Sequence, residues 1–108
     1  MSYNIRLEAE LKSAKKIVQL GEDYSITYNL GEMFSATVGS TPSEWDGMLA
    51  SELLPKLTVG INRLIFLPDD YRKYESPNGW GTIDGCREFL IKIQALCKEY
   101  PYAMVREE

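Results

Sequence analysis

The spacing of apolar residues changes along this chain, and that change most constrains its fold. Between Tyr3 and Leu11 apolar and polar residues alternate, a period of two that is typical of a strand with one buried face. In residues 53–65 and 83–97 apolar residues recur every three or four positions, the spacing of an amphipathic helix. A chain that uses the two periods in separate segments is expected to adopt an α+β fold.

The strands are expected to come mainly from the two ends of the chain. Residues 3–11 form the first strand, residues 16–20 a shorter second strand that ends at Gly21, and residues 102–106 a third strand beside the first. Residues 7–20 also suit a helix because they are rich in Glu, Ala, Leu and Lys, but we favour the strand. The sequence therefore predicts a small, mainly antiparallel sheet built from the N- and C-terminal segments.

About three helices are expected to pack on this sheet. A short helix capped by Thr27 or Asn29 ends at Gly39, and a second start signal at 41–44 opens an apolar face with Trp45, Met48 and Leu49. The stronger stripe of 53–65 begins near Ser51, which would place Pro55 in the first turn, and ends before Pro68. The last helix begins at Thr82 and stops at Pro101. Its expected inward residues are Ile83, Cys86, Phe89, Leu90, Ile93, Leu96 and Cys97.

Length and composition exclude several functions. A chain of 108 residues is expected to form a single domain, 1–108, with little room for a catalytic cleft. It has no histidine, which removes the common acid–base and zinc chemistry, and no spacing indicates a metal or cofactor site. Its net charge of −4 argues against direct nucleic-acid binding. We therefore expect a protein that is not an enzyme and has neither metal nor cofactor.

The two cysteines indicate the compartment. Cys86 and Cys97 lie in one expected helix, ~16 Å apart, too far for a disulfide. Free buried thiols fit a reducing cytoplasm, although the helix start near Cys86 would lower the pKa of that thiol and favour a nucleophile. The chain shows no signal peptide and no apolar run of the ~20 residues that a membrane span needs. We expect a cytoplasmic protein with no membrane contact.

Two polar segments supply candidate binding residues. Gly79 and Gly81 flank Trp80 just before a helix start, where backbone N–H groups can hold an anion and the indole can stack on a ring. Alternatively, the glycines only shape the turn and Trp80 fills the core. Hydroxyls and an amide are dense in residues 23–29, which form either a pocket wall or a loop with a helix cap. The candidate ligand-binding residues are Tyr28, Asn29, Asn78, Trp80 and Thr82.

Charge is unevenly distributed. No basic residue lies between Lys16 and Lys56, and residues 1–54 carry the whole net charge of −4. The acids of this interval are Glu22, Asp23, Glu32, Glu44, Asp46 and Glu52. Such a face suits a basic partner surface, with Glu44 and Asp46 as candidate contacts, or it is an ordinary solvated face.

Three segments carry a resemblance to a known group of proteins. Residues 26–33 (ITYNLGEM), 77–82 (PNGWGT) and 95–101 (ALCKEYP) resemble a family of small uncharacterised proteins of phages and prophages. The resemblance implies an accessory protein that acts in the bacterial host cytoplasm by binding, with a host protein as the first expectation. The alternatives are a binder of nucleotide-like small ligands at the turn Asn78–Trp80, and a structural or assembly protein, as a homodimer joined through an edge strand.

Overall fold

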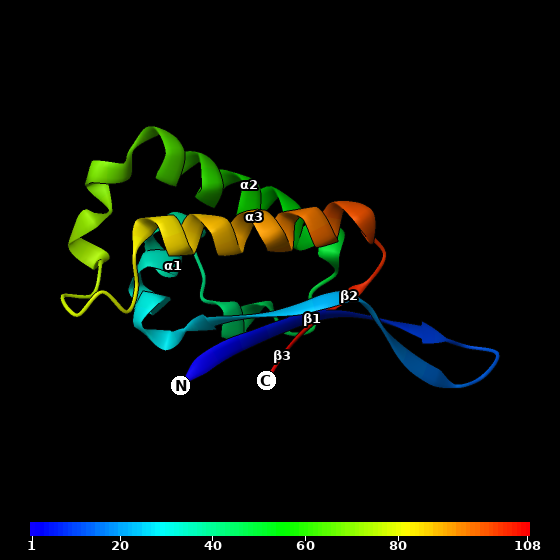
Figure 1. Ribbon diagram of the computed structural model, residues 1–108. Helices are drawn as coiled ribbons and strands as arrows, with labels where there is room; N and C mark the ends of the chain where they lie inside the picture. Colours follow the sequence, from blue (N-terminus) through cyan, green and yellow to red (C-terminus); the bar gives the residue numbers. More distant parts are fainter.

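The structure, a computed structural model, describes residues 1–108 and has the expected α+β architecture. A three-stranded antiparallel sheet has the order β2-β1-β3, with β1 at Ser2–Leu11, β2 at Lys16–Thr27 and β3 at Met104–Glu107. Three α-helices, α1 (Gly31–Thr37), α2 (Ala50–Phe66) and α3 (Ile83–Glu99), lie on one side of this sheet (Figure 1). Both ends of the chain therefore meet in one sheet, as the sequence predicted.

The alternation of β1 determines which face of the sheet is buried. Tyr3, Ile5 and Leu7 are buried under the helices, and Val105 of β3, which pairs with Leu7, is buried beside them. The helical alternative for residues 7–20 is therefore wrong. The buried residues of sheet and helices form one cluster, at whose centre Phe34 contacts Trp45 and Phe89 edge to face.

The second strand is longer than expected. A bulge interrupts its alternation of apolar and polar residues, so the pattern breaks off before the strand ends. Tyr24 pairs with Ile5 and Leu20 pairs with Leu7, so residues 21–23 lie opposite Arg6 alone. Gly21 makes this possible with a φ of +75°. The glycine therefore bends β2 instead of ending it, and the strand continues to Thr27.

The segment 41–49 does not form the expected helix. Only a 3₁₀ turn is present, Pro42–Trp45, and the chain then extends so that Gly47 and Met48 hydrogen-bond with Val105 of β3. Gly47, with a φ of +86°, prevents helical continuation. Trp45 is buried as expected, but Leu49 faces solvent.

The two long helices agree with their apolar stripes, with one exception. All seven expected inward residues of α3 are buried, and Thr82 caps this helix as predicted. Helix α2 begins one residue before Ser51, which places Pro55 at its sixth position, beyond the first turn. The prediction that Pro55 lies in the first turn is therefore wrong. Between the helices, residues 68–70 and 72–74 form two short 3₁₀ turns.

Candidate functional site

The turn before α3 is held by its own polar groups. The side-chain oxygen of Asn78 accepts hydrogen bonds from the Trp80 backbone N–H, at 3.0 Å, and from the Ser76 hydroxyl. The Ser76 N–H donates to the Gly81 carbonyl at 3.0 Å, and Gly79 has a φ of +79°. Asn78 and Gly79 therefore set the shape of the turn, and this shape determines where Trp80 stands.

Two further contacts fix the turn to the rest of the protein. The side-chain amide of Asn29 donates to the Trp80 carbonyl at 3.2 Å, which joins the polar segment 23–29 to the turn. Gly81 is buried so closely under Leu30 that a Cβ there would lie 3.2 Å from a Leu30 methyl carbon. Thr82 faces its own helix and accepts a hydrogen bond from the Gly85 N–H at 3.0 Å.

The indole of Trp80 points away from this framework. It is 70% exposed, so the alternative in which Trp80 fills the core is wrong; Trp45 is the buried tryptophan. Beside Trp80 lies a hollow of about 320 Å³ that is open to solvent and walled by the end of β2. The residues around this hollow are Met1, Ser2, Ser25, Ile26, Thr27 and Trp80.

Of the five candidate ligand-binding residues only Trp80 lines this hollow. Tyr28 is exposed next to Asn29, and its ring lies 4.4 Å from that of Tyr3. Asn29, Asn78 and Trp80 are connected by hydrogen bonds, whereas Thr82 serves as a helix cap. Sequence reasoning missed Ile26, which lines the hollow. It lies in the segment 23–29, in which only the polar side chains drew attention, so nothing in the sequence singled it out.

The two acids expected to contact a partner take part in internal contacts. The Glu44 carboxylate accepts a hydrogen bond from the Thr41 N–H at 2.7 Å and closes a capping box. Asp46 accepts from the Glu107 N–H at 2.9 Å and lies 3.5 Å from the Arg106 guanidinium. Reversal of either charge would therefore disturb the fold as well as any contact with a partner.

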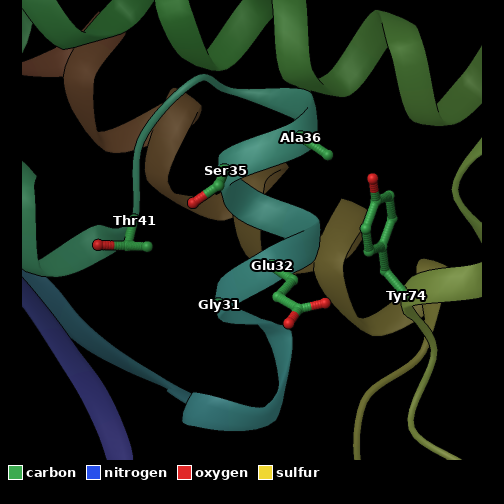
Figure 2. Close-up of a pocket in the computed structure, with 6 residues that line it drawn as sticks. All are labelled: Gly31, Glu32, Ser35, Ala36, Thr41 and Tyr74. Atoms are coloured by element: carbon green, nitrogen blue, oxygen red, sulfur yellow. The ribbon is translucent and has the colours of Figure 1, made fainter.

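Glu32 has a different setting. It is exposed on α1 and forms none of the ion pairs of the structure. Together with Ser35, Thr41 and Tyr74 it borders an open depression of about 560 Å³, in which the Tyr74 ring faces α1 (Figure 2). Among the acids of the interval without basic residues, Glu32 is therefore one whose charge is available to a partner.

Both cysteines are free and fully buried. Burial raises the pKa of the Cys86 thiol to about 12, and it raises the pKa of the Cys97 thiol to about 12 as well. The expectation of free, buried thiols is confirmed, and the alternative in which the start of α3 lowers the pKa of Cys86 is wrong because burial raises that pKa. Near neutral pH both thiols are protonated and neither is a nucleophile.

Neither a cluster of metal ligands nor a similar known protein points to a function. Nowhere do three or more Cys, Asp or Glu side chains converge as they would around a metal ion. None of the helices combines the length and apolar character that crossing a membrane requires. No protein family, curated protein or solved structure matches the chain.

Proposed function

We propose that this protein acts by binding a partner protein rather than by catalysis, through a surface formed by Trp80 and the residues Ile26 and Thr27 that line the hollow beside it. We call this surface the Trp80 face. The observation that carries the proposal is the position of Trp80, a large aromatic side chain that is 70% exposed on a turn held by hydrogen bonds from Asn29 and to Asn78. Exposed aromatic anchors on rigid supports lose little conformational entropy on binding, which makes them effective contact residues.

The shape of the surface favours a protein partner over a small molecule. Pockets for small ligands enclose most of the ligand surface, whereas the hollow beside Trp80 is open to solvent. An open hollow beside a protruding ring suits an apolar side chain of a partner, packed against the indole. Tryptophan is also among the residues most enriched at the energetic centres of protein interfaces.

The charge distribution indicates the partner's chemistry. The Ser25, Ile26 and Thr27 wall of the hollow belongs to the interval that has six acids and no basic residue. Glu32, in the same interval, borders the separate depression on α1 and has no internal ion pair. A partner with lysine or arginine around its apolar contact would be steered to this side of the molecule. Glu32 therefore replaces Glu44 and Asp46 as the acid to test.

The resemblance to phage and prophage proteins supplies the setting of the proposal. In that setting the partner is a protein of the bacterial host, and the site of action is the host cytoplasm. The buried, protonated thiols are consistent with a reducing compartment.

Site-specific crosslinking tests the proposal. A photoreactive phenylalanine analogue is placed at position 80 or, as a matched control, at position 102, because Tyr102 is 66% exposed and lies outside the Trp80 face. In living bacteria, position 80 should yield a discrete crosslinked protein that position 102 does not, and Glu32→Lys should weaken it. Equal crosslinking patterns at positions 80 and 102 would contradict the proposal.

A second candidate, a nucleotide-like ligand stacked on Trp80, is favoured by the hollow beside the indole. Because Trp45 is buried, added AMP or GMP should quench mainly the fluorescence of Trp80. Saturable quenching that disappears in Trp80→Phe would support this candidate and argue against the first. Unchanged emission at millimolar nucleotide would remove it.

A further inference from the structure

The tip of the β1–β2 hairpin is an arm that no other part of the protein supports. Strand β3 pairs with β1 only from Ile5 to Glu8, so residues 9–19 form a two-stranded ribbon. In Figure 1 this ribbon extends beyond the helices, and the molecule is 49 Å long but only 18 Å thick. Isolated two-stranded hairpins are marginally stable in water, so an arm of this kind gains from a surface against which it can pack.

Apolar side chains are exposed on both faces of the arm. Leu11 is 48% exposed and pairs with Lys16, so these two share one face; Ile17 is 65% exposed and pairs with Glu10 on the other. Ile17 and Met104, which is also exposed, line a small hollow of about 150 Å³. The arm thus combines apolar contact area with charge.

The loop of the arm contains a lysine in an unfavourable backbone conformation. Lys15 has a φ of +49°, the left-handed region, and is the only residue other than glycine there. Glycine or asparagine suits this position better than lysine. The turn itself therefore gives no reason for a lysine. Because residues in sparsely populated backbone conformations cluster at functional sites, the charge of Lys15 is a candidate contact.

The charge of the arm is opposite to that of the body. Lys12, Lys15, Lys16 and Glu10 give the arm, residues 9–19, a net charge of +2, and because the net charge of the chain is −4, the rest of the chain carries −6. These lysines are three of the four basic residues in the first 54 positions. The protein thus presents a cationic, partly apolar tip and an anionic body on the same chain.

We propose that the arm docks on the acidic body of a second copy of this chain, so that two arms related by a twofold axis join a homodimer. Each copy offers both the tip and the complementary surface, so the attraction occurs twice. A nucleic acid would attract the tip but would meet a body with a net charge of −6, which disfavours it. Simple pairing of the β2 edges is disfavoured as well, because the bulge at 21–23, with Glu22 and Asp23, interrupts that edge.

The test uses two triple variants of the full chain with the same net charge. In the arm variant, Lys12→Ser, Lys15→Asn and Lys16→Thr are combined; the control variant carries Lys56→Ser, Lys73→Ser and Lys98→Ser. Sedimentation equilibrium at about 100 µM protein measures the dimer in about 50 mM and about 500 mM salt. Circular dichroism checks that the arm variant is folded, which is expected because asparagine suits the position of Lys15.

The proposal expects a dimer for the wild type and the control variant, weakened by salt, and a dissociation constant at least about tenfold higher for the arm variant. Trp80→Ala should leave the dimer unchanged, which separates this result from the test of the Trp80 face. A wild type that remains monomeric at low salt overturns the proposal. A dimer that the arm variant forms as tightly as the wild type also overturns the proposal. A wild type that is monomeric and binds duplex DNA through its arm overturns it as well.

Discussion

Alkaline pH should destabilise this protein through its two buried thiols. Burial raises the pKa of Cys86 and Cys97 from an ordinary value of about 9 to about 12. The folded state therefore holds both thiol protons in a range where the unfolded chain releases them. This contribution to stability is fully present below about pH 9 and is lost as the pH rises from about 9 towards 12.

The size of the effect follows from the two pKa values. At a pH one unit above the unfolded pKa, each thiol costs the folded state roughly 1 kcal/mol, so the pair costs about 2–3 kcal/mol. This is a large part of the stability of a small domain, which is typically about 5–15 kcal/mol. The exposed tyrosines and lysines also titrate there, so a comparison with a variant is needed to isolate the thiols.

The assay compares the wild type with a double variant, Cys86→Ala and Cys97→Ala, in urea titrations with a phosphine reductant. The variant is less stable at every pH because it loses packed volume, but alanine does not titrate. Between pH 8 and pH 10 the wild type should therefore lose about 2–3 kcal/mol more than the variant. Parallel losses would refute the reasoning that burial keeps these thiols protonated.

Three further substitutions test the fold. Trp45→Ala should cost about 3–5 kcal/mol in urea unfolding because the ring is fully buried and its N–H donates to the Ser40 hydroxyl at 2.9 Å. Thr82→Ala should cost about 1 kcal/mol and Thr82→Ser much less, because serine keeps the cap on α3; an equal cost would contradict the capping role. Pro55→Ala should raise stability by about 1–3 kcal/mol, seen as a higher melting temperature, since alanine restores an N–H inside α2.

The predictable parts of the fold are those where one apolar period runs without interruption. The alternation of Tyr3 to Leu11 determined β1, and the stripe of α3 predicted every buried residue of that helix. Residues 16–27 were harder because the bulge at Gly21 breaks the period of two, so only the first part of β2 was recognised. Residues 47–49 pair with β3, a long-range contact that local spacing cannot indicate.

The candidate site was predictable in its members but not in their orientation. Turn chemistry identified Asn78, Gly79 and Thr82, and the same chemistry is compatible with an indole that points inward or outward. Only the packing of Gly81 under Leu30 and the hydrogen bond from Asn29 decide that Trp80 points to solvent. The free charge of Glu32, and the engaged charges of Glu44 and Asp46, likewise depend on contacts across the fold.

The central claim is that Trp80 is an anchor for a partner protein. It is tested most directly by isothermal titration calorimetry of the partner that crosslinks at position 80, with the wild type, Trp80→Ala and Tyr102→Ala. An anchor residue predicts a loss of about 2 kcal/mol or more for Trp80→Ala, roughly thirtyfold in the dissociation constant. Tyr102→Ala, at a similarly exposed aromatic, should change affinity less than about threefold. Equal affinities for the wild type and Trp80→Ala would contradict the account.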